Sequence, residues 1–464
     1  KEAITTEDSR VLVLAGAGSG KTKTLLQRIQ YLIDKKEVRP SEILGITFTK
    51  AAANEMIDRL IISTDTSGQY EKIISDVSQP KYEIKKTRRS FETRHKWISG
   101  LTIKTFHSLC YTILRQYGAN EFDNKFRIIL DSKTDNDEEF LNATAPELAI
   151  DVMQKILIER CKSNDFLLDF KRYILDYYVD KKHLKEGPYK ELNTYSKDFT
   201  TLDGTKVGSK SEQYIADWLY RHSIKYKYET TLIVENFPFR PDFFIPAANL
   251  CIEHVSDKSY PMGDKLKEYK RGGLHCVQTN DRIAKDTSLF NHELDRIFAG
   301  LLPKDYHAKV VLNFSEELKG YLGYVKDYLI QVLRVMDMIK TEGLSVDVIR
   351  LNSSNDQHER VRSFYDLALP LIGDYIKYCV NKSYLDFNDL ISTTISLCKN
   401  NEDVLQMLQS TFKYILVDEF QDVNNLQVDL LNLILTPESR LFCVGDDWQS
   451  IYGFRGSNVS YIID

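Results

Sequence analysis

The sequence predicts an α/β protein in which strands from both ends of the chain share one parallel sheet. The apolar run "VLVLA" leads into a glycine-rich turn and then a segment, 23–34, with apolar residues at helical spacing. The runs "YILVDEF" and "RLFCVGD" near the end of the chain are each followed by polar residues, as expected of central parallel strands. A long stretch is therefore inserted between strands of one sheet.

The inserted stretch is mainly helical, but its pattern changes to alternating helix and strand near its middle. Strand-like runs such as "PDFFIP", "LCIEHV" and "HCVQT" predict a small α/β module there. The expected boundaries are 1–110 and 401–464 for the α/β domain, 111–200 and 296–400 for a helical subdomain, and 201–295 for the inserted module.

The composition is that of a globular protein with several domains, with 464 residues and 42% hydrophobic residues. The net charge of −5 means that any nucleic-acid surface must be local. We expect a cytoplasmic protein without a membrane partner, because no apolar run is long enough to span a bilayer and no leader is visible. The seven cysteines form no C-x-x-C pair, which argues against zinc ribbons, iron–sulfur clusters and a disulfide framework.

One local basic run stands out at 81–96, where seven lysines and arginines are interleaved with two aromatic residues. Two interpretations stay open for this segment. It is either a solvated helix or mobile loop, or an arm that contacts phosphates.

The stretch "LVLAGAGSGKT" predicts a phosphate-binding loop, because a buried strand, a glycine-rich turn and a helix follow in that order. Backbone N–H groups of the turn would surround phosphate oxygens, the lysine would supply a positive charge, and the threonine hydroxyl would bind Mg²⁺. Ala15 replaces the first glycine of the usual pattern. The residues expected to bind the nucleotide are Gly16, Gly18, Ser19, Gly20, Lys21 and Thr22.

The run "YILVDEFQD" predicts the second half of this site, since it is an apolar strand that ends in two acids. We expect Asp418 to hold Mg²⁺ through water and Glu419 to polarise the attacking water. Together with Lys21 these acids indicate ATP hydrolysis with Mg²⁺ as cofactor.

Six stretches in order resemble the motifs of superfamily 1A DNA helicases of the UvrD/Rep/PcrA type. They are "AGAGSGKT", "ITFTKAAANEM", "TIKTFHSLC", "LDFNDLI", "ILVDEFQD" and "VGDDWQSIYGFRGS". The resemblance is close over roughly 1–120 and 380–464. It implies a RecA-like P-loop domain (1A) with a helical 1B subdomain that carries the inserted module.

The resemblance also implies roles for residues outside the phosphate loop. Gln449 would sense the γ-phosphate, and single-stranded DNA would be contacted by base stacking and through its backbone. Aromatic faces bind any base at about 1–3 kcal/mol each, although packing in a core is the alternative for each ring. The implied stacking residues are Phe48, Tyr452 and Phe454, and the implied backbone contacts are Thr105 and His107.

The family's adenine-reading segment would precede Lys1, and its second RecA-like domain, with the arginines that complete the ATP site, would follow Asp464. We therefore expect the natural protein to be longer, or its second half to lie outside this sequence. A protein partner is possible but unspecified.

The inserted module contains two acids on adjacent predicted strands, Asp242 and Glu253, and a third, Glu212, on the preceding helix. This order resembles restriction-endonuclease-like modules of the PD-(D/E)xK type, and the Vsr-like variants in particular. The resemblance implies that the three carboxylates hold Mg²⁺ or Mn²⁺, a hard cation that prefers oxygen ligands.

The usual lysine two residues after the second acid is replaced by Val255. A lysine from the next helix could supply the ammonium group instead, and we expect Lys270, with Lys267 as the alternative. His254 would point to the other strand face from Glu253, which weakens it as a ligand. An ordinary acid-bearing hairpin and a decayed nuclease that only grips DNA are the other interpretations.

Taken together, the sequence predicts an ATP-dependent single-stranded DNA translocase or helicase coupled to a divalent-metal-dependent nuclease. Its partner would be single-stranded or partly duplex DNA. The alternative is a helicase whose insert is a catalytically dead module that binds nucleic acid or a partner. A third, weaker alternative is a motor that acts on RNA.

Overall fold

A computed structural model describes most of the chain. The described residues are 2–16, 18–76, 78–118, 125–130, 147–181, 197–234, 237–255, 262–280, 287–299 and 311–446. They divide into two compact units. The first unit falls within Lys1–Val152, Gln331–Ile349 and Ile372–Asp464, and the second within Met153–Ile330 and Arg350–Leu371. The five-part division expected from the sequence stays a prediction.

The first unit is built on a parallel five-stranded sheet with the strand order β1-β15-β14-β2-β3. Its strands are β1 (Arg10–Leu14), β15 (Arg440–Gly445), β14 (Tyr414–Val417), β2 (Ile43–Thr47) and β3 (Thr102–Thr105). Strands from both ends of the chain alternate in this sheet, since β15 and β14 lie between β1 and β2. The predicted α/β class with a parallel central sheet is therefore confirmed.

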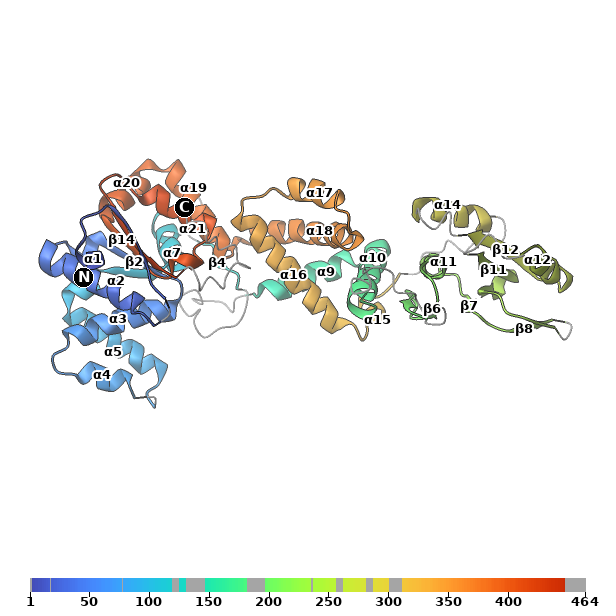
Figure 1. Cartoon of the computed structure of the whole chain (residues 1–464), viewed down its shortest axis with the longest axis horizontal. Helices are drawn as coiled ribbons and strands as arrows, with labels where there is room; N and C mark the ends of the chain where they lie inside the picture. The colour runs from blue at the N-terminus through green and yellow to red at the C-terminus, as the bar shows by residue number, and fades with distance from the viewer. Residues whose placement is uncertain are drawn as a thin grey trace. The chain divides into compact units, whose positions relative to one another are not determined.

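Helices cover both faces of this sheet (Figure 1). Leu416 and Phe442 pack against one layer, and Ile415 and Cys443 pack against the other, because alternate strand residues point to opposite faces. The first layer contains α2 (Lys21–Lys36) and α3 (Lys50–Thr64). The second contains α7 (Phe106–Tyr117), α19 (Phe387–Asn400), α20 (Glu402–Thr411) and α21 (Asn425–Ile434).

Short elements complete the first unit. They are α1 (Glu2–Thr5), η1 (Pro40–Glu42), α4 (Gln69–Ile74), α5 (Lys81–Arg94), α6 (Lys96–Ser99), β4 (Arg127–Ile128), β13 (Tyr384–Leu385) and η5 (Phe420–Asp422). The functional consequence of the sheet is that all five strands end at the same edge, where ligands of open α/β sheets bind.

The second unit begins with helices. They are α9 (Ala149–Arg160), α10 (Asn164–Ile174), η2 (Leu175–Val179), α15 (Phe314–Glu317), α16 (Leu322–Thr341), α17 (Val346–Ser354) and α18 (Glu359–Lys382), of which α9, α16, α17 and α18 extend into the first unit. An aromatic cluster joins them, since the rings of Phe170 and Tyr173 lie 5.1 and 5.4 Å from the ring of Tyr328.

The inserted module follows in the second unit as a mixed sheet with the strand order β12-β11-β10-β7. Strand β10 is antiparallel to both β7 and β11, whereas β11 and β12 are parallel. The main elements in chain order are α11 (Lys210–Arg221), β7 (Lys227–Tyr228), β10 (Phe243–Ile245), β11 (Leu250–Val255), α12 (Met262–Arg271), β12 (His275–Asn280) and α14 (Thr287–Phe298). Small pieces are β5 (Phe199–Thr200), β6 (Lys206–Val207), β8 (Leu232–Val234), β9 (Phe237–Phe239) and η4 (Pro246–Ala248).

The two faces of the module's sheet are covered by different helices. Ile252 packs with residues of α11 and α14, whereas Cys251 packs with Tyr269 of α12. Because side chains alternate along a strand, Glu253 shares the α12 face with Cys251. The expected hairpin therefore carries its second acid beneath α12.

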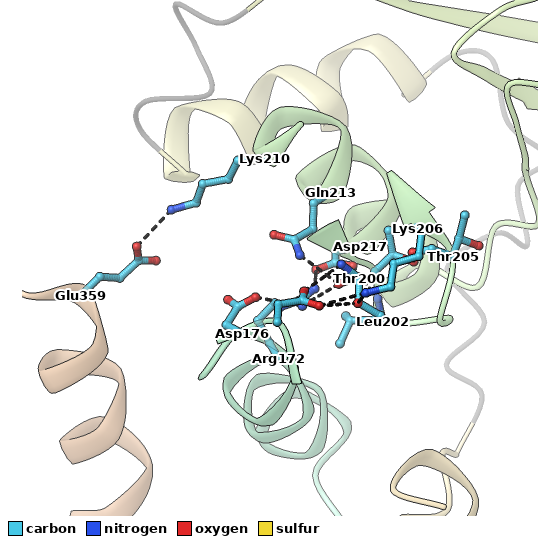
Figure 2. Close-up of polar contacts among 12 residues, drawn as sticks. Arg172, Asp176, Thr200, Leu202, Thr205, Lys206, Lys210, Gln213, Asp217 and Glu359 are labelled. Atoms are coloured by element: carbon cyan, nitrogen blue, oxygen red, sulfur yellow. Dashed lines mark hydrogen bonds and ion pairs between the residues drawn. The ribbon is translucent and has the colours of Figure 1, made fainter. Parts of the chain in front are cut away.

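A buried polar network holds α11 to α10 (Figure 2). The Arg172 guanidinium donates to Asp217 Oδ2 at 2.7 Å and to the carbonyl oxygen of Thr200 at 2.6 Å. Gln213 Nε2 donates to the same carbonyl oxygen at 2.9 Å. Within the described residues, no helix has both the length and the apolar character that crossing a bilayer requires.

Candidate functional site

The phosphate-binding loop connects β1 to the start of α2. Gly18 and Gly20 have φ angles of 71° and 92°, which favour glycine because other residues have a Cβ that clashes there. Ser19 Oγ donates to the carbonyl oxygen of Gly16 at 2.6 Å and closes the turn. Residues after Gly20 begin α2, so the free N–H groups of a helix start lie next to this loop.

The structure brings together the four side chains that the sequence predicted for ATP chemistry. Lys21 is 8% exposed, and its Nζ lies 2.9 Å from Glu419 Oε2. Thr22 Oγ1 donates to Asp418 Oδ2 at 3.1 Å. Both acids directly follow β14, whose neighbours β15 and β2 end at the same edge. The pairing of parallel strands therefore assembles the site from distant parts of the sequence.

Gln421 is a member of this site that the sequence analysis missed. Its Nε2 donates to Glu419 Oε2 at 2.7 Å, and its Oε1 accepts from the backbone N–H of Asp446 at 2.9 Å. It is almost completely buried. Gln421 thus links the acid after β14 to the residue that follows β15. The signal in the sequence was a glutamine two residues after the acid pair, at the end of an apolar strand.

Carboxylates outnumber cations at this edge of the sheet. Burial raises the pKa of Asp418, and the negative charge of Glu419 raises it further, against the opposing effects of Thr22 and Lys21. Burial and Glu419 raise the pKa of Asp422 to about 6. An added cation would relieve this repulsion.

The donor set suits Mg²⁺, which takes few protein oxygens and keeps waters and phosphate oxygens as further ligands. Thr22 Oγ1 and Asp418 Oδ2 are adjacent oxygens of this kind. Among the described residues, no three His, Cys, Asp or Glu side chains are grouped so that they could hold a metal ion by themselves. This is compatible with an ion that enters together with a nucleotide.

The residues implied to contact DNA lie at the ends of β2 and β3. Phe48 is half-buried and follows β2, next to Thr49, which caps α3. Thr105 Oγ1 accepts from Ser108 N at 3.1 Å and caps α7, and the ring of His107 lies 4.9 Å from that of Phe387. Their DNA contacts stay predictions. Three further predicted residues, Gln449, Tyr452 and Phe454, lie outside the described residues.

The second candidate site is in the inserted module, on the face of the sheet beneath α12. Glu253 is only 3% exposed, its Oε2 lies 2.8 Å from Lys265 Nζ, and its Oε1 accepts from the Tyr269 hydroxyl at 2.5 Å. Asp242 Oδ2 accepts from the backbone N–H of His254 at 2.6 Å. Asp242 and Glu253 therefore lie at the same end of the β10–β11 hairpin.

Burial raises the pKa of Asp242 to about 7, and the charges of Glu253 and Glu212 raise it further. The His254 N–H and Lys265 act in the opposite direction. The two hairpin acids thus repel each other in a partly dry site. Such a site is suited to a cation.

The structure corrects the choice of lysine. Lys265 contacts Glu253, whereas Lys267 and Lys270 are exposed. The reason is helical geometry, since Lys265 and Tyr269 are four residues apart and share the face of α12 that covers the sheet. Lys270 lies about 100° around the helix from Tyr269.

Glu212 is also placed differently from the prediction. It is at the start of α11, on the other face of the sheet from α12, and its Oε2 accepts from Gly208 N at 2.9 Å and Tyr228 Oη at 2.8 Å. With Ser209 it forms a capping box. The S-x-x-E spacing in the sequence was a signal of this structural role. The three predicted carboxylates are therefore not gathered around one point in the described structure.

His254 lies on the strand face opposite to Glu253, as its spacing predicts. Its Nδ1 lies 2.9 Å from Thr279 Oγ1 on the neighbouring strand β12. The structure thus shows a partner for the imidazole on β12.

Comparison with known proteins agrees with the first site. Residues 1–464 match the model of the UvrD/REP helicase N-terminal domain. The chain is 27% identical over 478 aligned positions to an ATP-dependent helicase/nuclease of Staphylococcus haemolyticus, covering 98% of this chain and 35% of that protein. It is 25% identical over 462 positions to the ATP-dependent DNA helicase PcrA of Staphylococcus aureus, covering 100% of this chain and 34% of that protein.

A shorter match is closer in sequence. Over 82 residues, 18% of this chain and 11% of the relative, it is 50% identical to the putative ATP-dependent DNA helicase YjcD of Bacillus subtilis. The chain spans about a third or less of the length of these curated relatives. The match over the whole chain, on a parallel sheet with a complete pair of phosphate-loop and acid residues, shows that the chain belongs to the UvrD/REP helicase N-terminal domain family.

Proposed function

We propose that this chain is the nucleotide-binding part of an ATP-driven DNA helicase that moves on single-stranded DNA. The observation that carries the proposal is the assembly of Lys21, Thr22, Asp418 and Glu419 at one edge of the sheet. The relatives named above are ATP-dependent DNA helicases by name, which supports the same activity here.

The residues divide the work of hydrolysis between them. Lys21 exchanges its contact with Glu419 for the phosphates of the nucleotide, and this frees Glu419 to orient a water and accept its proton. Gln421 keeps hold of Glu419 during this exchange and connects it to Asp446 at the end of β15. Thr22 and Asp418 would hold Mg²⁺, which neutralises phosphate charge when it is bound.

The experiment is to measure ATP hydrolysis by the protein that contains this chain, with and without single-stranded DNA. Hydrolysis that DNA accelerates is the expected result. The absence of acceleration by single-stranded DNA, with acceleration by RNA instead, would replace DNA by RNA as the track.

A second function is favoured by the inserted module. We propose that it cuts nucleic acid with the help of a divalent cation held by Asp242 and Glu253. The order α11-β7-β10-β11-α12-β12 and the parallel pairing of β11 with β12 agree with the restriction-endonuclease-like fold expected from the sequence. One relative is a helicase/nuclease by name, which supports the combination.

Lys265 takes the role that the sequence analysis gave to Lys270. Its ammonium group contacts Glu253 and lowers the pKa of Asp242, so its charge reaches both acids. At that position it would stabilise the negative charge that develops on a phosphate during cleavage. The bound cation would supply the activated water.

The alternative for the module is binding without cleavage. Incubating the protein with single-stranded DNA, duplex DNA and RNA, in Mg²⁺ or Mn²⁺ and in a chelator, separates the two functions. Cation-dependent products support a nuclease, whereas binding without products supports the alternative.

A further inference from the structure

The basic segment at 81–96 is a fixed helix in the structure. Arg88 Nε and Nη2 contact the two oxygens of Asp58 on α3 at 2.6 and 2.8 Å, and the Tyr70 hydroxyl donates to Asp58 Oδ1 at 2.5 Å. The ring of Phe91 is buried, with its centroid 4.9 Å from that of Tyr70. Helix α5 is thus anchored through one side, beside α3 and α4 (Figure 1).

The opposite side of α5 carries only positive charge. Its exposed charged side chains are basic, namely Lys85, Lys86, Arg89 and Arg94. Both acids of the helix, Glu83 and Glu92, are half-buried, and burial raises the pKa of Glu92. Residues 81–96 hold seven basic and two acidic residues, a net charge of +5 on a chain whose total is −5. We call the exposed residues Tyr82, Lys85, Lys86 and Arg89 the α5 face.

We propose that the α5 face binds the phosphate backbone of duplex DNA. Residues three and four apart lie on one side of a helix, so the members of the face form a continuous row. The row from residue 82 to residue 89 is about 10 Å long. Phosphates of one strand follow each other at about 3.4 Å along the duplex axis, so the row matches several of them.

Two observations favour duplex over single-stranded DNA. Single strands are bound by series of aromatic rings on which bases stack, and the α5 face has one exposed ring, Tyr82, at 67% exposure. The face is a rigid convex helix side with cationic tips, which suits contacts to phosphates without reading bases. It would add a site to those implied by the helicase motifs, because Asp58, which anchors α5, lies about 12 Å along α3 from the helix start beside Phe48.

The proposal predicts a specific loss in a Lys86→Glu/Arg89→Glu variant of the protein that contains this chain. Binding to a short blunt duplex should weaken by about tenfold or more at low salt. The slope of log affinity against log salt should fall in magnitude by about 1–2, as expected when about two phosphate contacts are lost. Binding to single-stranded DNA should change much less.

The matched control is Lys382→Glu/Lys399→Glu, which makes the same change in net charge at two exposed lysines outside α5. An equal loss in this control would show a general charge effect and overturn the proposal. Unchanged duplex binding in the α5 variant, with an unchanged thermal unfolding curve, would also overturn it. ATP hydrolysis at saturating single-stranded DNA reports on the motor separately, so a failed motor and a failed α5 face can be distinguished.

Discussion

Lys21 Nζ lies 2.9 Å from Glu419 Oε2, so the cation expected to bind phosphate and the acid expected to activate water are paired with each other. The pair joins the start of α2 to the end of β14. A nucleotide has to separate them before hydrolysis. The contact therefore keeps the acid occupied until phosphates compete for the lysine.

The two members of this pair should fail in different ways. Glu419→Gln should bind ATP with little change but hydrolyse it about 10²–10⁴ times more slowly, because the general base is lost. Lys21→Ala should lose nucleotide binding as well, because a phosphate contact is removed. Binding of a fluorescent ATP analogue and DNA-stimulated hydrolysis measure the two effects. Glu71→Gln, an exposed acid on α4, is the control, and normal turnover in Glu419→Gln would remove this acid from the mechanism.

Two lysines of α12 provide a matched pair for the inserted module. Lys265→Ala should abolish most cation-dependent cleavage, because it removes the ammonium group at Glu253. Lys270→Ala should cleave like the unmodified protein, since Lys270 is exposed. Product formation on labelled DNA is the measurement, with ATP hydrolysis as the control for folding. Equal loss in both variants would contradict the assignment of Lys265.

The pKa of Asp242 predicts a pH dependence of stability in the absence of divalent cations. Its value of about 7 in the folded protein is above the ordinary 3.8, so the folded state keeps a proton that the unfolded chain has released. Stability should therefore fall as the pH rises through this interval and level off above about 7. Asp242→Asn should flatten the dependence. Thermal unfolding in a chelator across the interval tests this, and parallel curves for the two proteins would contradict it.

The network in Figure 2 predicts that Arg172 is important for stability. Arg172→Met would leave Asp217 buried without its main counter-charge and should cost about 3–5 kcal/mol of unfolding free energy. Arg221→Met breaks a more exposed ion pair with Asp169 on the same two helices and should cost less than about 1 kcal/mol. Denaturant titration followed by circular dichroism compares them. Similar costs would show that burial does not set the value of these pairs.

The sequence by itself determined the α/β class and the composition of the ATP site. The reason is that a strand followed by a glycine-rich turn and a second strand ending in two acids can meet only where parallel strands end together. The contacts of Lys21 with Glu419 and of Thr22 with Asp418 follow from this arrangement. The hairpin with Asp242 and Glu253 was visible for a similar reason, because strand alternation decides which residues share a face.

Only the tertiary structure decided which partners these acids have. The sequence of α12 offers several lysines, and their distances from Glu253 depend on which side of the helix packs on the sheet. The burial of Tyr269 places Lys265 there and turns Lys270 to solvent. Gln421 and Glu212 show the same limit, because one is tied to Asp446 across the sheet and the other is used as a helix cap. Local periodicity determines the faces of an element, but packing between elements selects the face that becomes buried.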